Sequence, residues 1–137
     1  MRLHLQATPE EVHRAVEAVR QSRAARGLLD TTLFRAALVL EECGGNIVQH
    51  ALALDPRRSF QIVVQRIGGF LVLEFRDPGP PFDPTRIPRR QATPEDGDLQ
   101  GGWGIQLVRQ YADRIRYFRD GEENVLRVTV RIAEPPR

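Results

Sequence analysis

Two pairs of β-rich segments, each joined by a short turn, constrain the fold of this chain more than any other feature. Residues 59–66 and 70–76 are rich in Val, Ile, Leu and Phe, and Gly68-Gly69 stands between them. Residues 115–118 and 125–132 flank an Asp-Gly pair in the same way. Glycine-containing turns between such runs are typical of β-hairpins. Each pair is therefore predicted to form two neighbouring strands.

Helical patterns separate these strands. Thr8, Pro9 and Glu11 are typical of a helix start, because threonine caps the helix, proline suits its first position and glutamate closes a capping box. Apolar spacing predicts two further helices, over about 31–53 and 103–112. A short edge strand over about 2–5 precedes the first helix. The order β-α-α-β-β-loop-α-β-β predicts an α/β two-layer sandwich. We expect one domain, residues 1–137, with a mixed, mostly antiparallel sheet and helices on one face.

Composition narrows the protein class. Of the 137 residues, 41% are apolar and 28% are charged, and no apolar run approaches the roughly 20 residues that span a bilayer. The N-terminus lacks a signal-peptide pattern and Cys43 is the only cysteine, so we expect a cytoplasmic protein that does not bind membranes. All twenty basic residues are arginines. They form no basic block with interleaved aromatic residues, which argues against nucleic-acid binding.

A polar stripe follows the second predicted helix. Glu42, Asn46 and His50 are four residues apart, so they project from one face. A carboxylate and an amide oxygen one turn apart suit a hard cation that keeps several waters, and a carboxylate near a metal-bound phosphate can accept a proton from an attacking hydroxyl. An exposed helix face is the alternative explanation, and His50 alone is more typical of packing or capping. Gly44 and Gly45 weaken the helix, and one explanation is that another group approaches it closely there.

Two glycine-containing loops carry the other candidate residues. Asp77 follows a strong strand, where its carboxylate suits an exocyclic amine, and Gly79 allows a flat ring to approach the backbone. A proline-stiffened turn is the alternative. The sequence Gly-Gly-Trp-Gly-Ile at 101–105 opens a helix, and exposed N–H groups there suit phosphates. A flexible hinge is the alternative, since the spacing matches neither a P-loop nor a Rossmann loop.

Three segments together, 42–51, 77–83 and 101–108, resemble the N, G1 and G2 boxes of the GHKL ATPase superfamily, which includes histidine kinases, gyrase B subunits and heat-shock chaperones. The chain is most similar to the branch of anti-sigma-factor serine-protein kinases, and residues 113–126 also resemble the ending of that branch. The resemblance implies a Bergerat-type ATP-binding fold, with ATP and Mg²⁺ as ligands and an ATP lid over about 84–100.

The resemblance also implies roles for single residues. Glu42 corresponds to the general base and Asn46 to the Mg²⁺ ligand, while Asp77 corresponds to the residue that binds the adenine amine. The full set of nucleotide contacts that it implies is Asn46, Asp77, Gly79, Phe82, Gly101, Gly102, Trp103, Gly104, Ile105 and Thr129.

By resemblance, the activity is phosphorylation of a serine or threonine in an anti-sigma-factor antagonist, by a homodimeric kinase that also binds a sigma factor in a partner switch. A second hypothesis is a catalytically weak nucleotide-binding module that sequesters a sigma factor or another partner. The glycine pair before Asn46 supports it, because position 45 is commonly threonine in this branch. The ATP-binding half of a histidine kinase is disfavoured, because no phosphoacceptor helix precedes the domain.

Overall fold

A five-stranded sheet forms one layer of the protein in the computed structural model, which describes residues 1–89 and 103–136. The strand order is β1-β2-β3-β5-β4. The bounds are β1 Arg2–Gln6, β2 Ser59–Ile67, β3 Phe70–Asp77, β4 Arg114–Asp120 and β5 Glu123–Arg131. Both predicted hairpins are confirmed as neighbouring strand pairs, and their turns contain Gly68 and Gly121 at φ +56° and +59°. L side chains rarely adopt such positive φ values, so glycine suits both turns.

Every strand pairing in the described part of the sheet is antiparallel. The expected two-layer sandwich is confirmed, but the parallel pairing that a mixed sheet would contain is absent from these strands. The reason is the position of β5. The crossover from β3 to β4 makes these two strands run in the same direction, but β5 lies between them and is antiparallel to both.

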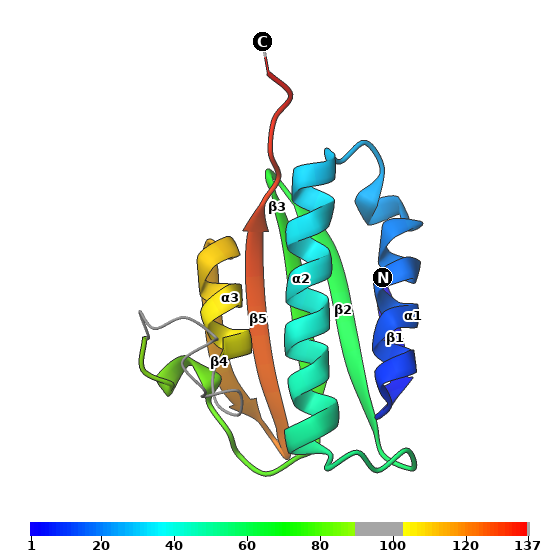
Figure 1. Ribbon diagram of the computed structural model, residues 1–137, viewed down its shortest axis with the longest axis vertical. Coiled ribbons are helices and arrows are strands. Elements are labelled where there is room, and N and C mark those ends of the chain that lie inside the picture. The colour runs from blue at the N-terminus through cyan, green and yellow to red at the C-terminus, as the bar shows by residue number, and fades with distance from the viewer. Residues whose placement is uncertain (90–102, 137) are drawn as a thin grey trace.

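Three helices cover one face of the sheet, with α2 in the middle (Figure 1). Their bounds are α1 Pro9–Arg20, α2 Asp30–Asn46 and α3 Trp103–Tyr111, and a short 3-10 helix, η1 Arg23–Ala25, follows α1. Thr8 caps α1 as predicted, since its hydroxyl accepts a hydrogen bond from the Glu11 N–H at 3.2 Å. No helix in the described ranges is long and apolar enough to cross a membrane.

The core lies between the two layers. Alternate residues of β3 and β5 point toward the helices, and Leu71, Leu73, Val128 and Val130 are almost completely buried. Burial of such side chains stabilises the fold by about 1.5–3 kcal/mol each. The same alternation continues to the lower end of the sheet in Figure 1, where β3 ends and β5 begins. This alternation of side chains along β3 and β5 therefore determines which polar residues at that end of the sheet face the helices.

The glycine pair in α2 is explained by helix packing at one position only. A Cβ atom at Gly44 would lie 3.2 Å from Val12 Cγ1, so α1 approaches α2 closely there. A Cβ at Gly45 would find no heavy atom within 4 Å. The close approach expected from the sequence thus comes from the neighbouring helix, and only at Gly44.

Candidate functional site

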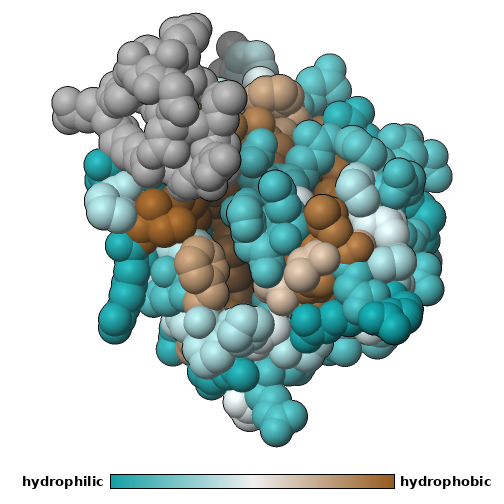
Figure 2. Space-filling view, turned by 60° about the horizontal axis from the view of Figure 1, so that its bottom comes forward, coloured by the Kyte–Doolittle hydropathy of each residue, from teal (hydrophilic) through white to brown (hydrophobic). Residues whose placement is uncertain are grey.

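A cavity of about 220 Å³ opens at the end of the sandwich where α2 and β3 end and β5 begins. This volume is several times the roughly 30 Å³ that a water molecule occupies in the liquid. Figure 2 brings this end forward and shows apolar surface in a hollow beside the grey residues. The cavity is lined by Cys43, Asn46, Ile47, His50, Ala51, Asp77, Pro80, Pro81, Phe82, Pro84, Ile105, Tyr117, Asn124 and Leu126. A mostly apolar hollow with a few polar groups is typical of a small-molecule site.

A π-helical turn, η2 Ile47–Ala51, forms one wall of this cavity. The Leu52 N–H donates to the Ile47 carbonyl at 2.8 Å, five residues back instead of four. The predicted α-helix to residue 53 is therefore wrong beyond Asn46. π-Turns are rare and often occur at functional sites. Periodicity alone did not reveal this one, because apolar spacing hardly distinguishes α from π geometry over five residues.

Asp77 lies at the end of β3 with only 5% of its surface exposed. Its Oδ1 accepts a hydrogen bond from the Gly79 N–H at 2.8 Å. A Cβ at Gly79 would lie 2.9 Å from the Ala51 carbonyl oxygen, so the loop presses against the π-turn and requires glycine. Asp77 Oδ2 receives no hydrogen bond from a described residue. A buried carboxylate oxygen is costly without a donor, so it is suited to a donor on a ligand.

Asn124 completes this group and was not predicted as a site residue. It is 5% exposed, lies opposite Asp77 in the β3–β5 register, and donates from Nδ2 to Asp77 Oδ1 at 3.0 Å. A signal was present in the sequence. Asn124 precedes Leu126, Val128 and Val130 at alternate positions, which places a polar side chain on the core face.

Glu42 and Asn46 face the first turn of α3. A Cβ at Gly104 would lie 2.7 Å from Glu42 Oε2 and 3.5 Å from Asn46 Nδ2, so a side chain there would displace the Glu42 carboxylate from its position against α3. Neither side chain hydrogen-bonds to another described residue. The structure thus brings together two of the predicted boxes.

Glu42 is half-buried, and its pKa is raised above the ordinary value for glutamate. The larger cause is burial, which disfavours the charged form, and the second is the negative charge of Glu41. A raised pKa strengthens the carboxylate as a proton acceptor, which is what a general base near neutral pH requires.

The other predicted residues divide into three groups. Ile105 is 2% exposed and Phe82 is 53% exposed, and both line the cavity. Thr129 is not brought into this group: it pairs with Val72, while its neighbours Val128 and Val130 point into the core. The pleat therefore directs Thr129 to the face of the sheet away from the helices. Gly101, Gly102, residues 90–100 of the expected lid and the side chain of Trp103 lie outside the described residues.

The first part of the expected lid is held against α3. A short 3-10 helix, η3 Pro84–Arg86, is capped by Asp83, whose Oδ1 accepts from the Thr85 N–H at 2.9 Å. Arg109 of α3 donates to the carbonyls of Thr85, at 3.0 Å, and Ile87. The segment that follows the cavity is thus tied to the helix that carries Gly104.

These residues fit a nucleotide with Mg²⁺. The described residues include no group of three His, Cys, Asp or Glu side chains that could hold a metal. Mg²⁺ often needs only one or two protein ligands, because it keeps waters and binds substrate phosphates, and Asn46 offers such a ligand beside Glu42. The two close approaches at Gly79 and Gly104, with an Asp77 oxygen that has no donor among the described residues, are consistent with contacts to a base and to phosphates.

Comparison with known proteins gives a family and a fold. The family described as "Histidine kinase-like ATPase domain" matches residues 5–130. The histidine kinase domain of the Erythrobacter litoralis blue-light-activated histidine kinase EL346 is 20% identical, with a TM-score of 0.50 over 93% of this chain and 61% of that one. A longer structure of the same kinase gives 0.54, at 20% identity, over 90% of this chain and 41% of that one.

The Acinetobacter baumannii histidine kinase AdeS is 15% identical, with a TM-score of 0.51 over 98% of this chain and 68% of that one. At these identities the structural likeness shows the fold alone. The chain spans about three fifths or less of the two EL346 structures. No curated protein sequence matches it.

Proposed function

The chain belongs to the histidine kinase-like ATPase domain family, within the GHKL superfamily that its sequence resembles, and on this premise we propose that it is an ATP-dependent serine/threonine protein kinase of the anti-sigma-factor type. Members of this superfamily are ATP-dependent kinases or ATPases, usually with Mg²⁺. The substrate of this chain is proposed to be an anti-sigma-factor antagonist in a partner-switching system.

One observation carries the proposal: Glu42 and Asn46 lie against Gly104 of α3, and Asn46 lines the same cavity as Asp77. Asp77 Oδ2, which has no donor among the described residues, is suited to the amine of adenine, and the first turn of α3 is suited to phosphates, because helix N-termini attract anions. Three segments distant in the sequence therefore supply base, metal and phosphate contacts around one ligand.

The proposed chemistry assigns each side chain a simple task. Asn46 binds Mg²⁺, which neutralises charge on the phosphates when bound. Glu42 accepts the proton of the substrate hydroxyl as its oxygen bonds to the γ-phosphorus, and the bond from that phosphorus to the β–γ bridging oxygen breaks. Burial of Glu42 raises its pKa and thus its basicity.

The partners are proposed on the resemblance alone. They are the antagonist, a sigma factor and a second copy of the chain in a homodimer. The second candidate function is a nucleotide-binding module with little transfer activity. Gly45 favours it, because glycine weakens the helix that carries Glu42 and Asn46, and no neighbouring atom requires glycine at this open position.

ATP binding tests the proposal first. We expect Mg²⁺-dependent binding in isothermal titration calorimetry, and a loss of that dependence in Asn46→Ala. Gln49→Ala is the matched control, because Gln49 is also an amide on this helical segment but lines the groove toward α1. Equal affinity with and without Mg²⁺ in the wild type would contradict the metal role.

Transfer from γ-radiolabelled ATP to the cognate antagonist separates the two candidate functions. We expect Glu42→Gln to lower the rate by about 10²–10⁴-fold, the usual contribution of a general base. Glu41→Gln, measured at a pH above the acidic limb of the pH–rate profile, is the control, since it removes a neighbouring exposed carboxylate. ATP binding without any transfer by the wild type would favour the binding module.

A further inference from the structure

We propose that Asn124 is a positioning residue that holds Asp77 in the one orientation that selects a 6-amino purine. This inference rests on the proposed function, because it assumes that the cavity binds a nucleotide base. It adds a specificity role for a residue of β5 that neither the sequence motifs nor the family match assigns.

The amide nitrogen of Asn124 faces three acceptors. Nδ2 donates to Asp77 Oδ1 at 3.0 Å and to the Pro80 carbonyl at 2.9 Å, and it lies 3.4 Å from the Gly79 carbonyl. Because these groups are acceptors only, the position requires a donor. Asn124 thereby ties the end of β3 to the loop that follows it.

The amide oxygen of Asn124 faces three donors. Oδ1 accepts from the Phe82 N–H at 3.2 Å, the Tyr117 hydroxyl at 2.5 Å and Arg119 Nη1 at 3.2 Å. Donors on one side and acceptors on the other determine the orientation of the amide. Asparagine satisfies both sides, whereas aspartate has the same shape but no donor for the acceptor side.

The consequence for Asp77 follows from its two oxygens. Oδ1 already accepts from the Gly79 N–H and from Asn124, so it is held in place. Oδ2 is left as the carboxylate oxygen without a described donor. A base with an amine at position 6 supplies that donor, whereas a base without the amine leaves the buried charged oxygen unpaired.

The test compares ATP with purine riboside triphosphate, which lacks the 6-amine. We expect the wild type to bind ATP at least about tenfold more tightly, because the analogue loses a hydrogen bond to a charged acceptor. Asn124→Asp should reduce this ratio to below about threefold on the same scale, because aspartate has no N–H to donate to Asp77 Oδ1, and two facing acceptors would no longer hold Asp77 in its orientation.

Arg119→Ala is the matched control, because Arg119 does not line the cavity and the substitution removes one donor from the Oδ1 side, with its contact to the Gly79 carbonyl, while the Nδ2 side stays intact. We expect it to keep the wild-type ratio while thermal melting shows that each variant is folded. An equal loss of the ratio in Arg119→Ala and Asn124→Asp would overturn the inference, since general loosening of the loop would explain both.

The failures are distinguishable. A wild type that binds neither nucleotide refutes the proposed function, and this inference with it. A wild-type ratio that persists in Asn124→Asp refutes the inference alone. If that variant does not fold, the ratio is measured on Asn124→Ala, which adds no charge. If neither variant folds, Asn124 determines folding rather than selectivity, and the inference is wrong.

Discussion

Replacing Gly45 by alanine should stabilise the protein. Gly45 is the penultimate residue of α2, the helical backbone continues beyond it into η2, and a Cβ there would meet no heavy atom within 4 Å. Glycine in a helix interior is less favourable than alanine by about 1 kcal/mol. With nothing to oppose that gain, Gly45→Ala should raise the free energy of unfolding by about 1 kcal/mol.

Gly44→Ala is the matched comparison, one residue earlier in the same helix. Its Cβ would lie 3.2 Å from Val12 Cγ1 and 3.4 Å from Cγ2, tighter than ordinary packing. Overpacking a core costs about 1–3 kcal/mol, which offsets or exceeds the helical gain. We therefore expect Gly44→Ala to be neutral or destabilising, and less stable than Gly45→Ala by at least ~1 kcal/mol.

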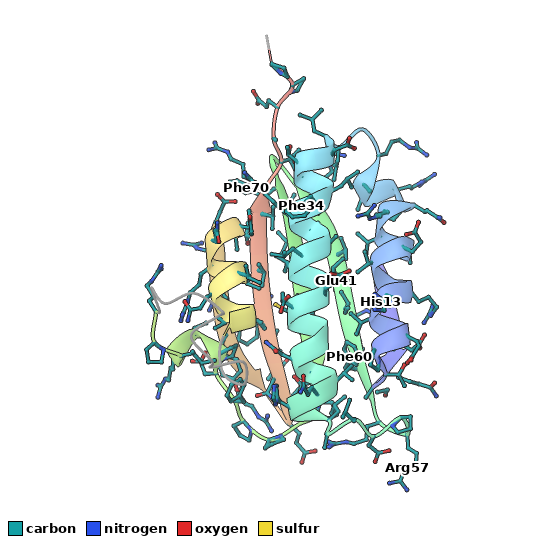
Figure 3. The ribbon with its side chains drawn as sticks, in the orientation of Figure 1. His13, Phe34, Glu41, Arg57, Phe60 and Phe70 are labelled. Atoms are coloured by element: carbon teal, nitrogen blue, oxygen red, sulfur yellow. The ribbon has the colours of Figure 1, made fainter. Side chains whose placement is uncertain are left out.

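Urea unfolding followed by circular dichroism measures both variants. For 137 residues the unfolding entropy is roughly 0.3 kcal/mol/K, so Gly45→Ala should raise the melting temperature by about 3 °C. The groove that Gly45 lines lies between α1 and α2, where Glu41 and His13 also lie (Figure 3). The substitution should therefore leave ATP affinity unchanged. Equal stability changes in the two variants would refute the packing argument.

Three further predictions concern the candidate site. Glu41→Gln should lower the pKa of Glu42, so the acidic limb of the pH–rate profile for phosphoryl transfer should move to lower pH, because the base then ionises earlier. Gly104→Ala should slow transfer by about tenfold or more in a steady-state assay, because its Cβ would displace the Glu42 carboxylate. Arg109→Ala should speed amide hydrogen exchange across residues 84–89, because it removes the donors to two carbonyls there.

The hairpins were predictable because their information is local. The turn glycines require positive φ, and alternating apolar residues can bury only one face of a strand, so residues 59–77 specify their own pairing. Helix α1 was equally readable from Thr8 and its capping hydrogen bond. The π-turn was not, because apolar spacing hardly distinguishes α from π geometry over five residues.

The candidate site was predictable only in part. Glu42, Asn46 and Asp77 were proposed because the order of three motifs resembles a known superfamily, and the family match agrees with that superfamily. Thr129 was proposed from its place on the last strand, but the pleat directs it away from the cavity. Asn124 was overlooked, although its alternation with buried residues already placed it on the core face.

The sequence alone determined which segments become strands and helices, and which loops carry glycine and polar residues, because those properties depend on neighbours along the chain. Only the tertiary structure decided which of these groups touch. Asp77 and Asn124 are 47 residues apart and meet because β3 and β5 pair in one register. Likewise Gly44 meets Val12, and Gly104 meets Glu42, because helices pack at distances that local patterns do not encode.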